Sequence, residues 1–173
     1  MVIKIFYFVI SIFSVAMVYL TIQDPYHSDF LKPDKNIANM RMGNVVDYEI
    51  NSTLISGRYE AQSWNRYSDR DEFVMFKAQI LKDDLEHNLS SINAMHKSNV
   101  FLFKNNVNYI NSDRVNFKSE EAKYDINKKI LSSTVPFVIT QNSDKITGNN
   151  VTYDVNSKKI YAKGIKAWIE EKR

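Results

Sequence analysis

The sequence predicts an antiparallel all-β domain that follows one apolar N-terminal helix. Residues 117–139 and 146–169 resemble each other, and self-similarity at a spacing of about thirty residues indicates one supersecondary unit used more than once. Apolar side chains in both segments recur at every second position, which is the period of a strand with one buried face. Near the start of the chain, residues 5–22 contain no charged side chain.

The two repeat segments match best around a turn. With a one-residue gap at Ser157, Tyr124 and Asp125 align with Tyr153 and Asp154. Each pair precedes an asparagine, which tolerates a left-handed backbone, so each segment is predicted to form a β-hairpin. The alternating residues after the two turns are Leu131, Ser133, Val135, Phe137 and Ile139 in one copy, and Tyr161, Lys163, Ile165, Ala167 and Ile169 in the other.

Composition agrees with a strand-rich domain and excludes several classes of function. The chain has 173 residues, with 10 Tyr, 10 Phe and only 4 Gly, and aromatic residues favour strands. Its net charge is +3 and its basic residues are scattered among acidic ones, so we expect no nucleic-acid partner. Because cysteine is absent, a disulfide framework, a thiol nucleophile and a cysteine-based metal site are impossible.

The uncharged N-terminal segment predicts a transmembrane helix. Eighteen residues at about 1.5 Å per residue give about 27 Å of helix, enough to cross a hydrocarbon core. Lys4 precedes the segment and Asp24 follows it, so the positive-inside rule places the N-terminus in the cytoplasm. A cleaved signal peptide is the alternative, because residues 14–16 resemble a cleavage site. We therefore expect an anchor at 1–22, a linker at 23–43 and a β-domain at 44–173.

Within the β-domain, the elements follow from strand and turn patterns. A hairpin is expected around Asn51 and Ser52, a polar loop at 64–72 and an alternating strand at 73–80. Residues 85–95 fit a helix or a strand equally well. Two short strands, at 100–103 and 107–110, are expected on either side of a Lys-Asn-Asn turn.

No residue pattern indicates catalysis, a cofactor or a metal. His27, His87 and His96 are far apart and lack metal-ligand spacing, so we expect ordinary surface or half-buried roles. Asp125 and Asp154 occupy equivalent turn positions, where local hydrogen bonds to the backbone explain them better than acid–base chemistry. We expect a protein that is not an enzyme.

The pattern as a whole resembles the LptC family of lipopolysaccharide-export proteins, whose domain is of the OstA and LptA type. The resemblance combines one membrane helix, a short polar linker and a single domain of short repeated strands. Residues 48–59 resemble the first strands of the family. The remaining matches are Ala122 to Asn127 with Lys129 and Ile130, and Ile146, Gly148, Val151, Tyr153, Asp154, Lys159 and Ile160.

The resemblance implies a β-jellyroll of two packed antiparallel sheets with an open-ended apolar groove between them. Such a protein is an inner-membrane, single-pass protein whose domain lies in the periplasm of a Gram-negative bacterium. It accepts lipopolysaccharide from an inner-membrane ABC transporter, which hydrolyses the ATP. It then passes the lipid to an LptA-like periplasmic bridge by edge-to-edge pairing of jellyrolls.

The groove residues are predicted by taking the more apolar face of each strand as the inside. Acyl chains need such a surface because each buried methylene is worth about 0.8 kcal/mol. Phe137 and Ile139 are the strongest candidates, since their strand alternates cleanly. The predicted lipid-binding residues are Ile55, Tyr59, Phe76, Ile80, Phe101, Phe103, Val135, Phe137, Ile139, Val151, Tyr153, Ile165 and Ile169.

A second interpretation of the same pattern is a membrane-tethered scaffold that assembles an envelope complex. In that case the interior between the sheets is a closed core and holds no lipid. An open apolar groove that reaches the end of the domain would favour transport, whereas a sealed interior would favour the scaffold.

Overall fold

The structure is a computed structural model that describes residues 2–22, 36–51, 54–82 and 84–170. Its contacts divide the chain into two units, Met1–Asp34 and Lys35–Arg173. Most of the linker expected at 23–43 lies outside the described residues. The β-domain begins earlier than expected, because its first strand starts at Met40.

The first unit contains helix α1 (Val2–Ile22). Its apolar side chains are exposed, including Phe6 at 61% and Val15 at 68%. The Thr21 hydroxyl donates to the carbonyls of Met17 and Val18 at 3.0 and 2.8 Å, so this polar group is satisfied within the helix. In the described part of the chain, no helix combines the length and the hydropathy that crossing a bilayer requires.

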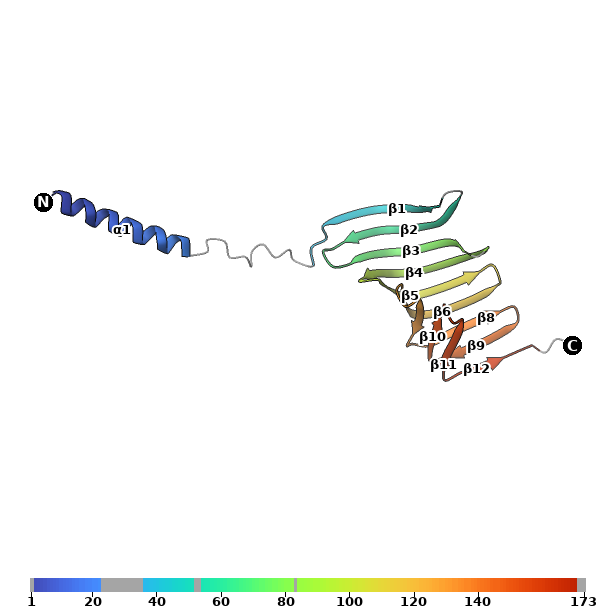
Figure 1. The fold of residues 1–173 in the computed structure, drawn as a ribbon. Helices are drawn as coiled ribbons and strands as arrows, with labels where there is room; N and C mark the ends of the chain where they lie inside the picture. Colours follow the sequence, from blue (N-terminus) through green and yellow to red (C-terminus); the bar gives the residue numbers. More distant parts are fainter. Residues whose placement is uncertain (1, 23–35, 52–53, 83, 171–173) are drawn as a thin grey trace. The chain divides into compact units, whose positions relative to one another are not determined.

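The second unit consists of antiparallel strands, which confirms the all-β prediction (Figure 1). The segment at 85–95, which fitted helix or strand, is a strand. The strands are β1 (Met40–Ile50), β2 (Ile55–Arg66), β3 (Asp71–Lys82), β4 (Leu85–Lys97), β5 (Val100–Asn111), β6 (Val115–Asp125), β7 (Ile130–Ser133), β8 (Phe137–Gln141), β9 (Asp144–Gly148), β10 (Asn150–Asp154), β11 (Lys159–Lys163) and β12 (Lys166–Trp168).

Hydrogen bonding joins all twelve strands into one sheet, where two separate sheets were expected. Strands β1 to β6 form a meander in which each strand pairs with the next. The sheet then divides at β6, because its residues 115–119 pair with β8 and its residues 123–125 pair with β7. One branch runs β7-β10-β11 and the other runs β8-β9-β12 (Figure 1). The two expected sheets are thus two halves of one forked sheet.

A line of backbone irregularities crosses the middle of the sheet, and we call it the bend. On β1 and β3 it is marked by left-handed residues, Asn44 at φ 52° and Met75 at φ 53°. The pairing registers shift on β4 and β5 at the same level. Further along, the bend is the gap between β7 and β8, between β9 and β10, and between β11 and β12. Irregularities of this kind bend a strand and increase its local twist.

The bend divides the sheet into two halves, which we call the first and second walls. The first wall consists of the parts of β1 to β6 that lie on the Met40 side of the bend. It continues into β7, β10 and β11. The second wall consists of the parts of β1 to β6 that lie on the Ile50 side of the bend. It continues into β8, β9 and β12.

Two loop predictions in this region are wrong for the same reason. Asn105 and Asn106 were expected to close a turn, but β5 runs through them with φ values of 63° and 56°. Left-handed asparagines suit a bulge as well as a turn, so composition alone does not distinguish the two. Likewise, Trp64 lies within β2 and Asp71 opens β3, so the expected loop at 64–72 shrinks to a tight turn.

The hydrophobic core follows the bend. Val107 and Phe137 are only 1% and 2% exposed. The buried serines Ser91, Ser119 and Ser133 accompany them, and each hydroxyl donates to a backbone carbonyl two residues further on. These bonds satisfy carbonyls at the places where the strand ladder is interrupted. The buried apolar cluster comprises Phe76, Ala78, Ala94, Phe103, Val107, Phe117, Ala122, Phe137 and Val151.

The repeat hairpins predicted from sequence are present, but their alignment needs a correction. Asp125 pairs with Ile130, and Asp154 pairs with Lys159, so both loops contain four residues and the gap at Ser157 disappears. Asp125 accepts the backbone amide of Lys128 at 3.0 Å, and Asp154 accepts those of two residues in its own turn. Both aspartates therefore stabilise turns, as expected.

Replacing Met75 with glycine should stabilise the protein. A non-glycine residue in the left-handed region costs roughly 1–2 kcal/mol, and the added freedom of glycine in the unfolded chain offsets part of that gain. Because the side chain is 47% exposed, little packing is lost. We expect a net gain of about 0.5–1 kcal/mol in thermal unfolding of the full chain. Met75→Ala, which keeps the strain, should give no gain, and a loss in Met75→Gly would contradict this account.

Candidate functional site

The candidate site is the inner face of the sheet, meaning the face that carries the buried residues of the bend. Residues that pair directly across neighbouring strands lie on the same face, so the register defines its rows. On the second wall one apolar row crosses the sheet from β2 to β12 without a charged residue. The row consists of Tyr59, Ala78, Leu89, Tyr109, Phe117, Ile139, Ile146 and Ala167.

The inner face of the first wall is aromatic. Neighbouring ring centroids lie 4.4 to 5.8 Å apart, within the range in which aromatic pairs attract each other. This run of rings extends from the turn end of the wall to the bend and back, and the rings at the turn end are partly exposed. In order of contact the rings are Trp64, Phe73, Phe76, Phe103, Phe101 and His96.

Several polar groups on the inner face bond to one another. The Tyr59 hydroxyl donates to Glu49 at 2.9 Å, and the Tyr109 hydroxyl lies 2.7 Å from Nδ1 of His87. On the first wall the Asp71 carboxylate accepts the Trp64 indole N–H at 2.9 Å and Nε of Arg66 at 2.8 Å. Such internal pairing lets polar side chains lie beside apolar rows at little cost.

Burial and hydrogen bonding shift the pKa values of three of these groups. Burial, together with the hydrogen bond to Glu49, raises the pKa of Tyr59 to about 12. Burial also raises the pKa of Tyr109. For Asp71, burial acts to raise the pKa, but the donors Arg66 and Trp64 outweigh it and hold the pKa below its usual range. Both tyrosines therefore stay neutral, and Asp71 stays ionised beside its donors.

Nine of the thirteen predicted lipid-binding residues lie on the inner face or in the core at the bend. Phe76, Phe103, Phe137 and Val151 are buried core residues. Tyr59, Ile80, Phe101 and Ile139 are partly buried against that core. Tyr153 pairs with Leu131 on the first wall and is half-buried. Phe137, at 2% exposed, is thus a packing residue, whereas Ile139 remains accessible in part.

Four of the predicted positions differ from the expectation. Ile55, Ile165 and Ile169 are 55%, 53% and 74% exposed, so they do not lie inside. Ile55 is beside the β1–β2 turn, where the pairing register shifts, and Ile165 falls in the gap between β11 and β12. Val135 lies in the corresponding gap between β7 and β8. A period of two cannot be extended across such a break, because the strand changes direction there.

Sequence reasoning missed much of the inner face. Leu89 was not assigned to a face because its segment fitted helix and strand equally. Tyr109 was not assigned because β5 was expected to be two strands separated by a turn at the asparagines. Phe117 and Ile146 lie at the starts of the repeat segments, before the residues whose alternation was followed. Their row becomes visible only when the register of neighbouring strands is known.

Both ends of the sheet are open. Among the described residues, β1 pairs only with β2, and β11 pairs only with β10. An edge strand leaves backbone donors and acceptors free for another strand, and proteins usually protect it with charge. Here large apolar side chains are exposed on and beside the edges, interspersed with exposed charged ones such as Asp47, Glu49, Lys159 and Lys163. The apolar ones are Val46, Tyr48, Ile50, Leu54 and Ile55 at one edge, and Ile160, Tyr161, Ile165, Trp168 and Ile169 at the other.

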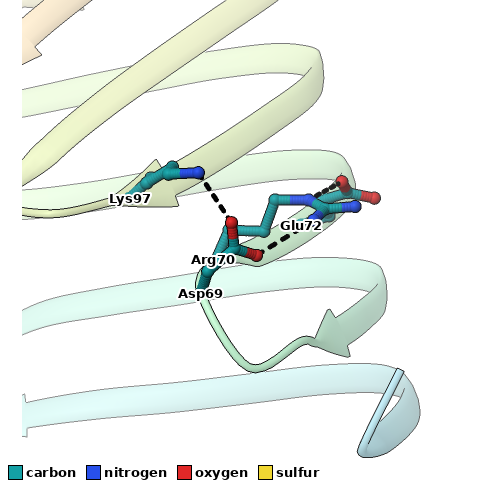
Figure 2. A network of polar contacts seen from close by, with 4 residues as sticks. All are labelled: Asp69, Arg70, Glu72 and Lys97. Carbon is teal, nitrogen blue, oxygen red and sulfur yellow. Dashed lines mark hydrogen bonds and ion pairs between the residues drawn. The ribbon is translucent and has the colours of Figure 1, made fainter. Parts of the chain in front are cut away.

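An ion-pair network fastens two turns at the end of the first wall. Asp69 accepts Nζ of Lys97 at 2.6 Å and the guanidinium of Arg70 at 3.0 Å, and Arg70 also donates to Glu72 at 2.7 Å (Figure 2). The Arg70 guanidinium lies 4.1 Å from the ring centroid of Tyr67. Exposed pairs of this kind contribute about 0–1 kcal/mol each, so the network orients the β2–β3 turn against β4 and supplies no unpaired anion site.

The described residues contain no group of three or more His, Asp or Glu side chains placed to hold a metal ion. Comparison of the sequence with models of protein families gives no match, and comparison with curated proteins gives none either.

Proposed function

We propose that this chain is a membrane-tethered lipopolysaccharide-transport protein of the LptC type, with a jellyroll domain. The observation that carries the proposal is the uncharged inner row that crosses the second wall from Tyr59 to Ala167. Each strand adds one apolar side chain to this row, so it forms a track perpendicular to the strands. Acyl chains gain about 0.8 kcal/mol for each methylene that such a surface removes from water. The proposal includes no catalytic step and no cofactor.

The proposal places α1 in the inner membrane as a single-pass anchor, with the β-domain in the periplasm, although no helix of the described residues reaches the length and hydropathy of a membrane span. Its support is the uncharged run at 5–22 and the exposure of the apolar side chains around α1. An ABC transporter in the same membrane would deliver the lipid and supply the energy. Co-purification of the full-length chain from membranes with such a transporter is the direct test of this partnership.

The two open edges are the proposed meeting points with partner strands. Edge-to-edge pairing extends a sheet with main-chain hydrogen bonds and requires unpaired edges. In this proposal the edge formed by β11 and β12 meets an LptA-like bridge protein. Its apolar track would then continue into the partner.

A photo-crosslinker at Ile139 should capture lipopolysaccharide when the transporter hydrolyses ATP. Ile139 lies on the inner row and is only partly buried, whereas its neighbour Val138 points to the opposite face. A crosslinker at Val138 is therefore the matched control and should capture far less. Equal capture at both positions, or none at either in a folded protein, would exclude the lipid track.

Proline at position 162 should weaken binding to the bridge protein without unfolding the domain. The Lys163 carbonyl accepts the Asn149 amide, so the N–H of the preceding residue, Ala162, points away from β10. Ala162→Pro removes that outward donor and leaves the ladder with β10 intact. Pull-down of the bridge protein should decrease, while Lys159→Ala in the same strand leaves it unchanged. A folded Ala162→Pro variant with normal binding would remove β11 from the interface.

The scaffold interpretation is the second candidate, and the packed bend favours it. Val107, Ser133 and Phe137 are almost completely buried at the bend. If this packing extended to the ends of the walls, no lipid could enter, and the edges alone would act in assembly. The Ile139 crosslink distinguishes the two functions, because the scaffold predicts partner binding without lipid capture.

A further inference from the structure

The outer face of the second wall differs in chemistry from the inner face. Its first row, read across paired strands, contains Lys77, Ser90, Asn108 and Lys118. Directly paired side chains lie about 5 Å apart, so these groups form one continuous polar strip. The row continues through Val138 on β8, which interrupts the polar strip, and Thr147 on β9 to Lys166 on β12.

The second outer row adds amide side chains and another lysine. Gln79, Asn88 and Asn116 lie on it, and Lys145 follows on β9. Together the two rows surround a cavity of about 290 Å³ between β2 and β5. Its lining includes Lys77, amides and a hydroxyl from both rows, and Glu60, whose carboxylate is paired with Arg58.

Four lysines on this face form no ion pair among the described residues. They are Lys77, Lys118, Lys145 and Lys166, whereas Arg58 at the margin is paired with Glu60. We call this surface the basic face. The outer face of the first wall is different, because Lys97 and Lys104 there are paired with Asp69 and Glu121. Cations concentrated on one face attract anions.

Two amide oxygens on the basic face are buried without a hydrogen-bond partner, Oδ1 of Asn108 and Oδ1 of Asn116. The two residues are diagonal neighbours, because Asn108 pairs with Lys118 and Asn116 pairs with Ile110. A buried acceptor without a donor costs about 1–3 kcal/mol, so its presence needs an explanation. Asn108 lines the cavity, and its broad terminal torsion allows the amide to turn toward a donor there.

We propose that the basic face binds an acidic oligosaccharide. A hydroxyl group of a sugar in the cavity would donate to the Asn108 oxygen, and the sugar's carboxylates or phosphates would lie near the lysines. An anionic lipid surface would satisfy the lysines but is flat, so it would not place donors in the cavity. The site faces away from the apolar track, so it is independent of the proposed transport of lipid.

The test uses the full-length chain in detergent and a defined probe, tetragalacturonate, with its methyl ester as the uncharged match. Calorimetry should detect binding of the acid and much weaker binding of the ester, and added salt should weaken the former. The pair Lys77→Gln/Lys118→Gln should reduce affinity about tenfold. Lys123→Gln is the matched control, because this unpaired lysine lies on the outer face of the first wall.

Asn108→Leu separates the sugar from a simple charge effect. The variant should also lose about tenfold in affinity, yet its melting temperature should not fall, because an unsatisfied acceptor has been removed. Retained affinity in Asn108→Leu, or equal loss in Lys123→Gln, would overturn the proposal. So would stronger binding to phosphatidylglycerol vesicles that depends on the lysines alone. Failure to bind both tetragalacturonate and a sialic acid tetramer would overturn it as well.

Discussion

Replacing Phe137 with alanine is expected to lower the free energy of unfolding by about 3–5 kcal/mol. The ring is 2% exposed and packs against Phe117 with a centroid separation of 6.2 Å. It also pairs with Ser119 on one side and Gly148 on the other, so it lies where the second branch leaves β6. Removing it leaves a cavity at the fork that the surrounding strands cannot close without moving.

Chemical denaturation of the full-length chain in detergent, followed by circular dichroism, measures this loss. Tyr161→Ala is the matched control, since that side chain is 60% exposed on β11 and its removal should cost less than about 1 kcal/mol. A loss below about 1 kcal/mol in Phe137→Ala would mean that the ring is not part of the core. Phe137 would then return as a candidate for lipid contact.

Gly148→Ala is expected to cost about 1–3 kcal/mol, because it forces atoms into the space that Phe137 occupies. A Cβ at this position would lie 2.6 Å from Cε1 and 2.7 Å from Cζ of the Phe137 ring, and 3.1 Å from the Lys163 carbonyl oxygen. These atoms belong to a buried ring and a backbone, so they cannot give way easily. Gly43→Ala is the control, since a Cβ there would lie 3.9 Å from its nearest neighbour, the Gln62 carbonyl oxygen.

A double-mutant cycle with Phe137→Leu tests whether this contact is the cause. The leucine side chain lacks the two ring atoms that collide with the new Cβ. The double variant Phe137→Leu/Gly148→Ala should therefore be more stable than the sum of the single losses predicts, with a coupling of about 0.5–3 kcal/mol. Additive losses would show that Gly148 is required for another reason, such as its approach to Lys163.

The sequence was sufficient to predict the strands where alternation was uninterrupted. The hairpin turns at Asp125 and Asp154 were recognised because aspartate and asparagine stabilise turns locally, and such preferences need no knowledge of distant residues. The membrane anchor and the lipid track remain predictions. Ile139 was placed on the inner face correctly because its strand alternates without a break.

The bend could not be predicted from local patterns. Asn105 and Asn106 were compatible with a turn or a bulge, and only the partner strands decide between these outcomes. The same break moves Val135 and Ile165 away from the faces that simple alternation assigns to them. Ile169 was placed inside for the same reason, although it lies beyond the last strand. The rows of the two faces depend on register, which is a property of neighbouring strands rather than of one segment.

The order of pairing along β1 to β6 affects how the chain can fold. Each of these strands pairs with the one made just before it, so five hairpin contacts need only short loops to close. Three pairings join strands that are not consecutive in the chain: β6 with β8, β7 with β10, and β9 with β12. A chain that emerges from its N-terminal end can therefore add strands one at a time until β6. Completion of the fork then becomes the late step of folding, and it waits for the last few residues to arrive.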